Sequence, residues 1–165
     1  MAVTRHPTRR DVVRGAAAVA AAAFACPALA QAAPRIAVIG GGFGGAACAR
    51  ALRRLDAKLQ VTLIEPNRTF TACPFSNEVI AGLRELSAQQ FTYDKVAANG
   101  ITVVAQAAAK IDAQARSIAL SDGTTLSYDR LVLAPGIDMH FDALPGYDEA
   151  AAEKMPHAWK AGAPP

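Results

Sequence analysis

The sequence is poor in net charge and in cysteine, and each shortage excludes a class of protein. The net charge of +3 arises within residues 1–30, and the rest of the chain carries equal numbers of basic and acidic groups. A basic face for a nucleic acid is therefore not expected. There are three cysteines, and Cys26 lies within that N-terminal segment, so at most one disulfide could form beyond it. Because 52% of the 165 residues are hydrophobic and no low-complexity tract or repeat follows residue 30, one globular domain is expected.

The first 30 residues are expected to form a twin-arginine export signal. Residues 8–14 hold an arginine pair with apolar residues two and three places after it, and the uncharged run 15–25 follows. This run is too short to span a bilayer but suits the apolar part of a signal, so no transmembrane segment is expected. An amphipathic or core helix is the alternative, but the alanine run has no polar face. Small residues at Ala28 and Ala30 predict cleavage after Ala30 and a periplasmic location.

A glycine-rich turn organises the rest of the chain. An apolar run predicts a buried parallel strand over 35–39, and an alanine-rich run predicts a helix over 44–55. Between them, Gly40, Gly42 and Gly45 fit the spacing G-x-G-x-x-G. The first glycine would turn the chain out of the strand, the second would let a pyrophosphate approach the backbone, and the third would let the helix pack on the strand. The helix N-terminus would offer N–H groups to the phosphates.

A second apolar run, 60–64, predicts the next parallel strand, and it ends in Glu65, 20 residues after Gly45. An acid at this point can accept hydrogen bonds from a ribose diol. The alternative is a glycine-rich turn in an ordinary α/β protein, with Glu65 as a solvated charge. The spacing of strand, glycines, helix and acid favours a dinucleotide site.

The predicted helix over 44–55 carries one cysteine and a group of arginines. Cys48 is expected to be a small packing residue that faces the core, and Arg50, Arg53 and Arg54 are expected to face water. A disulfide between Cys48 and Cys73 is conceivable in an exported protein. The core-facing position expected for Cys48 argues against it.

The remaining pattern predicts an α/β fold, in which a Rossmann-like parallel sheet carries an inserted antiparallel meander. The Pro- and Asn-containing loop over 66–77 follows the carboxyl end of a strand, where ligands of such sheets bind. An Asp-Gly pair at Asp122 and Gly123 marks a turn of the meander. The other expected elements are helices over 76–86 (with Ser76 as a possible cap), 93–98 and 149–154, a strand over 101–105, meander strands near 109–112, 117–121 and 125–128, and a buried strand over 131–136.

Three stretches carry a resemblance to known flavoproteins. The order of elements, together with Tyr128–Gly136, resembles the two-dinucleotide-domain flavoproteins of glutathione-reductase-like fold. More narrowly, Cys73–Gly82 and Met155–Gly162 resemble the flavoprotein chain of flavocytochrome c sulfide dehydrogenase. The resemblance covers about residues 35–162, and these last two stretches are its specific part, since the glycine motif is generic.

This resemblance implies an FAD-dependent oxidoreductase that takes two electrons from sulfide and passes them singly to a cytochrome c subunit. Cys73 matches the cysteine that the family joins covalently to FAD through a thioether, and a redox-cycling thiol or an inert loop thiol is the alternative. Residues 31–140 would be the first part of the FAD-binding domain, and residues 141–165 a linker and the start of a second domain. No metal is expected. The implied cofactor-binding residues are Gly40, Gly42, Gly44, Gly45, Glu65, Pro66, Asn67, Cys73, Ala108, Ala134 and Gly136.

The sequence departs from the family in what it does not contain. The redox-active cysteine pair and the second dinucleotide-like domain have no counterpart in it. The chain is therefore expected to be an N-terminal fragment that contains no catalytic residue. His157 is expected to pack with Trp159 and His140 to lie in a loop, so neither is expected to have a direct chemical role. The alternatives are a sulfide–quinone oxidoreductase or an NAD(P)H-dependent reductase of the same fold, or a non-catalytic nucleotide-binding fragment.

Overall fold

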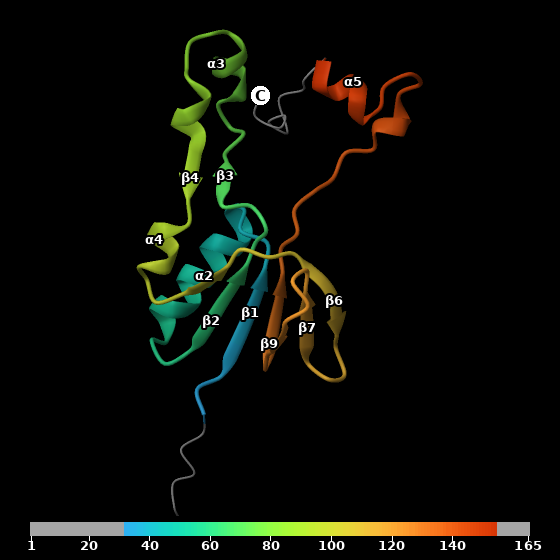
Figure 1. Cartoon of the computed structure of the whole chain (residues 1–165). Coiled ribbons are helices and arrows are strands. Elements are labelled where there is room, and N and C mark those ends of the chain that lie inside the picture. Colours follow the sequence, from blue (N-terminus) through green and yellow to red (C-terminus); the bar gives the residue numbers. More distant parts are fainter. Residues whose placement is uncertain (1–31, 155–165) are drawn as a thin grey trace, which may run out of the picture. The chain divides into compact units, whose positions relative to one another are not determined.

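The computed structural model describes residues 32–154, which are built around a four-stranded parallel sheet (Figure 1). The strands are β1 (Arg35–Ile39), β2 (Gln60–Ile64), β5 (Thr102–Val104) and β9 (Arg130–Leu133). Their order is β5-β2-β1-β9, so the first strand of the chain lies in the middle of the sheet. The strands predicted over 35–39 and 60–64 are confirmed to the residue, and the α/β fold with them.

One face of this sheet is covered by α2 (Phe43–Leu55) and α4 (Asp94–Ala97). Side chains alternate between the faces of a strand, so Ile36 and Val38 point to this layer while Ala37 points to the other. Val38 and Leu63 are fully buried beneath the helices. The other buried members of this core are Ala49, Val61, Tyr93, Val96 and Ile101.

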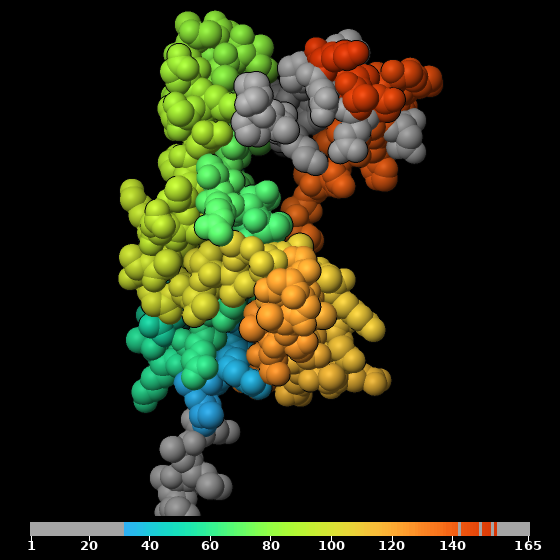
Figure 2. Space-filling model, in the orientation of Figure 1, coloured from blue at the N-terminus to red at the C-terminus, as the bar shows by residue number. Residues whose placement is uncertain are grey.

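The opposite face is covered by the predicted meander, whose strands are β6 (Ala108–Asp112), β7 (Ser117–Leu120) and β8 (Thr125–Ser127). Ile118 is fully buried between the meander and the sheet, in one cluster with Ala37 and Ile64. Figure 2 shows the blue N-terminal strand and the gold and orange meander as neighbouring surfaces. The predicted Asp-Gly turn is confirmed, because Gly123 has a φ of 85° and the Asp122 carboxylate accepts a hydrogen bond from the Thr124 N–H.

Residues 65–93 leave the sheet as an excursion, and here the sequence-based prediction was partly wrong. The loop expected over 66–77 contains β3 (Thr69–Thr71), which pairs in antiparallel fashion with the unpredicted β4 (Gln90–Thr92). Phe70 lies opposite Phe91 in this ribbon, a cross-strand aromatic pair of the kind that stabilises antiparallel strands. The Pro and Asn content of the loop concealed this pairing, because the two strands are short and far apart in sequence.

The helix expected over 76–86 is also shorter than predicted. Helix α3 (Ser76–Ile80) begins after Phe75, so Ser76 lies inside it and is not its cap. The helix ends early because Gly82 adopts a left-handed φ of 72°, a conformation typical of helix C-termini. A short 3-10 helix, η1 (Leu86–Gln89), then leads into β4.

Two expectations about α2 are corrected. Arg53 does not simply face water, because its guanidinium donates hydrogen bonds to the carbonyl oxygens of Ala57, Leu59 and Asn99 and so holds the turn after the helix. Cys48 is only half-buried, and the neighbouring Ala49 fills the core position instead.

After β9 the described chain contains η2 (Phe141–Ala143) and α5 (Glu149–Lys154), and the second of these matches the helix predicted over 149–154. Between residues 32 and 154, no helix is long and apolar enough to cross a membrane. The predicted export signal and the stretch 155–162 lie outside the described residues, as does His157.

An ion pair ties the start of the first strand to the start of the last. The Arg35 guanidinium donates to both carboxylate oxygens of Asp129 (3.1 and 3.3 Å), and the Arg35 backbone N–H donates to the same carboxylate at 2.8 Å. These hydrogen bonds from Arg35 lower the pKa of Asp129 to about 2. The pair therefore joins β1 to β9 across most of the length of the chain.

We expect Asp129 to contribute to the acid stability of the fold. A lowered pKa in the folded state gives a stabilisation that is present above the unfolded value of about 3.9 and is lost as the pH falls toward 2. Asp129→Asn should therefore flatten the dependence of the urea unfolding midpoint on pH between about 4 and 2. As a control, Arg35→Gln should raise the NMR-measured pKa of the Asp129 carboxyl toward its ordinary range, while the hydrogen bond from the backbone N–H of residue 35 keeps part of the shift. A normal pKa in the unmodified protein would contradict the prediction.

Candidate dinucleotide-binding site

The glycine turn brings three backbone segments so close together that side chains are excluded. Gly40 has a φ of 98°, and a Cβ atom there would meet the carbonyl of Ala134, just beyond β9. A Cβ on Gly45 would meet the carbonyl oxygen of Gly40. Gly40 thus makes the sharp turn out of β1, and Gly45 lets α2 pack on the strand end.

Two further glycines of the turn, Gly42 and Gly44, leave room for a side chain, so their small size has a different reason. A Cβ on Gly42 would find only Phe70, at 3.7 Å, and one on Gly44 would find no atom within 4 Å. Gly42 caps the 13-residue helix α2 without any side-chain hydrogen bond, and no acidic residue lies in the first turn. The N–H groups and positive dipole end of α2 are therefore open to an anion such as a pyrophosphate.

Glu65 lies beside this turn, at the end of β2, and is already partly engaged. One carboxylate oxygen accepts a hydrogen bond from the Gly41 N–H at 2.8 Å, and the other accepts from the backbone and side-chain N–H groups of Asn67 at 3.0 and 2.9 Å. A carboxylate has about four lone-pair sites, so one remains for another donor. The arrangement suits a ribose hydroxyl.

Tyr93 is a member of the site that the sequence-based prediction missed. It lies between β4 and α4, is only 8% exposed, and its hydroxyl donates to the Gly41 carbonyl oxygen at 3.1 Å. Burial, together with the nearby Glu65 charge, raises the pKa of Tyr93 to about 12. No sequence motif surrounds Tyr93, and only its position at the start of a predicted helix could have marked it as a core residue.

The other predicted site residues differ in how near they lie to the glycine turn. Ala134 follows β9 and donates its N–H to Ile39 at 2.8 Å, so it borders the glycine turn, and Gly136 beyond it has a φ of 82°. Pro66 follows Glu65 directly, while Ala108 begins β6 and packs against the core beneath the meander.

Cys73 lies in the excursion, between β3 and α3. Its thiol is half-buried and lies 3.9 Å from the carbonyl oxygen of Thr71. It is not joined to Cys48, so the alternative of a disulfide between these two residues is not realised in the structure. The structure thus brings together the glycine turn, Glu65, Asn67, Tyr93 and Ala134. The roles toward FAD that the sequence predicts for Cys73 and for the members of this group other than Tyr93 stay predictions.

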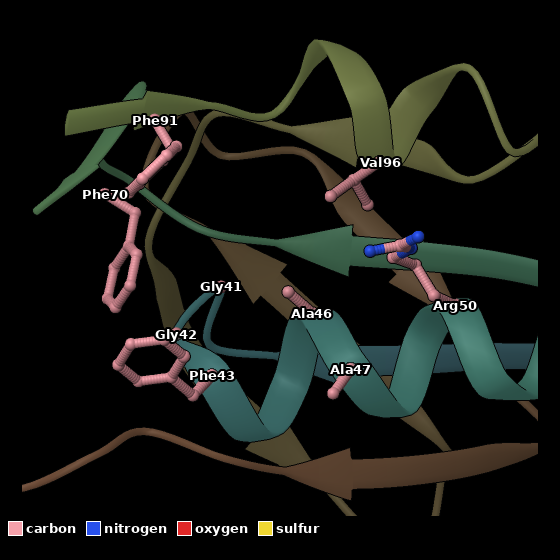
Figure 3. Close-up of a pocket in the computed structure, with 9 residues that line it drawn as sticks. All are labelled: Gly41, Gly42, Phe43, Ala46, Ala47, Arg50, Phe70, Phe91 and Val96. Carbon is pink, nitrogen blue, oxygen red and sulfur yellow. The ribbon is translucent and has the colours of Figure 1, made fainter. Parts of the chain in front are cut away.

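An apolar hollow of about 310 Å³ lies between the outer side of α2 and the β3–β4 ribbon (Figure 3). Phe43 and Phe70 meet there edge to face, with their ring centroids 5.1 Å apart. Its other lining residues are Gly41, Gly42, Ala46, Ala47, Arg50, Phe91 and Val96. The hollow borders the glycine turn, and its lining is mostly apolar, with Arg50 as the charged residue among those that line it.

Taken together, these features define a dinucleotide-binding domain. The parallel sheet, the glycine turn, the open helix N-terminus and the acid after β2 meet at one edge of the sheet, and an antiparallel meander covers the sheet face opposite the helices. Within residues 32–154, no cluster of His, Cys, Asp or Glu could hold a metal ion. The geometry of these residues fits a dinucleotide cofactor.

Comparison with known proteins assigns the family. The family model described as pyridine nucleotide-disulphide oxidoreductase matches residues 34–160, so the chain belongs to this family of FAD-dependent oxidoreductases. The resemblance to the flavocytochrome c flavoprotein is confirmed over a short segment. Over 45 residues, 27% of this chain, it is 58% identical to the sulfide dehydrogenase [flavocytochrome c] flavoprotein chain of Chlorobaculum thiosulfatiphilum, and the match covers 94% of that sequence.

The longer matches include a probable ferredoxin reductase, NADH dehydrogenase-like proteins and sulfide:quinone oxidoreductases. The mitochondrial enzyme of Mus musculus is 28% identical over 115 residues, which is 70% of this chain and 26% of the enzyme. The X-ray structure of the sulfide:quinone oxidoreductase of Aquifex aeolicus superposes with a TM-score of 0.63 and 31% identity, covering 66% of this chain and 26% of that one. The chain therefore spans about a quarter of the length of these two relatives.

The glycine geometry predicts opposite effects for two neighbouring substitutions. Gly44→Ala should raise the free energy of unfolding by about 0.5–1 kcal/mol, because alanine is the better helix former and the added Cβ meets nothing. Gly45→Ala should lower it by at least about 2 kcal/mol, because the Cβ would collide with the Gly40 carbonyl. Urea unfolding of both variants tests this pair. Equal effects of the two substitutions would contradict the geometry.

Proposed function

We propose that this chain is the FAD-binding part of a sulfide dehydrogenase that passes electrons to a cytochrome c. The observation that carries the proposal is the 58% identity to the flavocytochrome c flavoprotein chain. The sulfide:quinone oxidoreductases among its relatives support sulfide as the electron donor. The chain spans about a quarter of the length of those sulfide:quinone oxidoreductases, so the activity of the whole protein stays part of the proposal.

In this proposal, the described residues hold the ribose and pyrophosphate end of FAD. The N–H groups at the start of α2 bind the pyrophosphate, and the remaining lone pair of Glu65 accepts from the adenosine ribose. Asn67 orients that carboxylate through its two hydrogen bonds. FAD itself supplies the capacity to accept two electrons and to release them singly.

We also propose that Cys73 binds the flavin covalently through a thioether. The cysteine lies in the excursion that leaves the carboxyl end of β2, the edge at which ligands of such sheets bind. The new bond joins its sulfur to a methyl carbon of the flavin. One hydrogen leaves the thiol and one leaves the methyl group, and the flavin ring takes up both, so the step needs no further oxidant. A covalent bond would keep the cofactor with a protein exported to the periplasm.

Analysis of the mature protein from its natural host tests the export and the covalent bond together. Edman sequencing should begin at Gln31, because cleavage is expected after Ala30. Peptide mass mapping should find the flavin on the peptide that contains Cys73. Cys73→Ser should remove the flavin mass, while the control Cys48→Ser should retain it. Flavin on no peptide of the unmodified protein would refute the thioether, and an uncleaved N-terminus would refute the export signal.

A second candidate function is a sulfide:quinone oxidoreductase. The similarity to the enzymes of Mus musculus and Aquifex aeolicus covers more of this chain than the flavocytochrome c match does. The two candidates share the electron donor and differ in the acceptor, so the acceptor decides between them. A pyridine nucleotide reductase, the third candidate, differs in the donor.

The donor and acceptor can be tested with the whole protein under anaerobic conditions. Sulfide should bleach the flavin absorbance near 450 nm (about the usual position for oxidised flavin), and added cytochrome c should restore it with appearance of reduced haem. A short-chain quinone in place of cytochrome c should restore it much more slowly. Faster reoxidation by the quinone would favour the second candidate. Bleaching by NADH or NADPH but not by sulfide would refute the proposal.

A further inference from the structure

We propose that Tyr93 is a positioning residue for the phosphate-binding turn, holding Gly41 so that the next N–H group faces the pyrophosphate. The inference deepens the proposed function, on which its flavin readout rests. Gly41 is held from two sides: Glu65 accepts from its N–H at 2.8 Å, and the Tyr93 hydroxyl donates to its carbonyl oxygen at 3.1 Å. Both backbone groups of Gly41 are therefore committed to specific side chains.

The hydrogen bond from Tyr93 sets the orientation of the following peptide group. Within residues 32–154 all peptide bonds are trans, so the N–H of Gly42 points opposite to the carbonyl of Gly41. Because that carbonyl points toward the buried Tyr93, the Gly42 N–H points away from the core. Among the described residues, that N–H has no hydrogen-bond partner, and it lies at the open N-terminus of α2.

Tyr93 also explains why residue 41 is a glycine, although the motif places no requirement there. A Cβ on Gly41 would lie 2.6 Å from Cζ and 2.7 Å from Cε1 of Tyr93. The ring thus packs directly on the glycine backbone and excludes any larger residue. This contact is independent of the φ angle of Gly41, which is not in the left-handed region.

The hydroxyl remains a hydrogen-bond donor at any pH at which the protein is expected to work. Burial raises the pKa of Tyr93 to about 12, and the one charged group that acts on it, Glu65, adds to the increase. The proposed contact is therefore constant and is not a pH switch.

The position of Tyr93 in the chain gives the contact a wider consequence. Tyr93 directly follows β4, which pairs with β3, and the chain leaves β3 toward Cys73. Tyr93 thus ties the closing end of the cysteine-bearing excursion to the turn that would bind the phosphates. A second contact joins the same parts of the chain, because Phe70 of β3 packs edge to face on Phe43 of α2 with ring centroids 5.1 Å apart.

The test compares two buried tyrosines in the whole protein, in a Cys73→Ser background so that FAD binding is reversible. Tyr93→Phe removes only the hydroxyl that holds Gly41. Tyr128→Phe is the matched control, because Tyr128 is 6% exposed and its hydroxyl lies 3.5 Å from the Asp112 carbonyl oxygen, in the meander. For each variant, the FAD dissociation constant is measured by fluorescence titration and the amide exchange of residues 40–46 by hydrogen–deuterium mass spectrometry.

Tyr93→Phe should raise the FAD dissociation constant about five- to tenfold, the loss expected for one buried hydrogen bond, and speed exchange in residues 40–46. Tyr128→Phe should change neither by more than about twofold, although both variants lose some thermal stability. Equal FAD affinity and equal exchange in the two variants would overturn the inference. If no variant binds FAD, the proposed function fails, and amide exchange in residues 40–46 then decides the inference by itself. Faster exchange in Tyr93→Phe than in Tyr128→Phe supports the role of Tyr93, and equal exchange overturns it.

A second pair of variants tests the steric contact between the Tyr93 ring and residue 41. Gly41→Ala should lower the thermal midpoint strongly with Tyr93 present and much less in combination with Tyr93→Ala, because the colliding ring is then gone. Strictly additive effects would show that the ring does not set the identity of residue 41.

Discussion

The close approach of three backbone segments at the end of β1 is the constraint on which the rest of the structure depends. Gly40 turns under the carbonyl of Ala134, and Gly45 lies against the carbonyl of Gly40, so strand, helix and the last strand meet without any side chain between them. Only this approach lets α2 start directly above the strand ends with its N–H groups exposed. The two core layers, beneath the helices and beneath the meander, then pack on the two faces of the sheet that carries this turn.

Hydrogen bonds to Glu65 make a carboxylate compatible with the glycine turn. A carboxylate beside an anion-binding helix N-terminus would repel the anion if the carboxylate charge were not compensated. Glu65 instead accepts three hydrogen bonds, one from Gly41 and two from Asn67, which spread its charge over backbone and amide dipoles. The carboxylate thereby becomes part of the turn's scaffold and keeps one lone pair for a ligand.

The parts of this fold that sequence could predict are those set by local pattern. The strands over 35–39 and 60–64, the glycine turn and the meander follow from apolar runs, glycine spacing and an Asp-Gly pair, each a local signal. The β3–β4 ribbon escaped prediction because Phe70 and Phe91 pair across 20 intervening residues. The contacts of Arg53 and Tyr93 were not predicted for the same reason, because each side chain donates to backbone carbonyls that only the folded chain brings near. The glycines of the site were predictable, but the side chains that orient them were not.

The proposed division of the site between a non-covalent and a covalent half would have a physical consequence. For the proposed ribose–pyrophosphate end of the cofactor, the described residues offer a helix N-terminus and one carboxylate lone pair. With the flavin end tethered through Cys73, as proposed, binding at the other end becomes intramolecular, with an effective concentration on the order of millimolar for a short linkage. A modest affinity of the glycine turn is then enough to keep it filled. The turn's task in such a protein is orientation more than retention, which is the task that a clamp on Gly41 from Tyr93 and Glu65 serves.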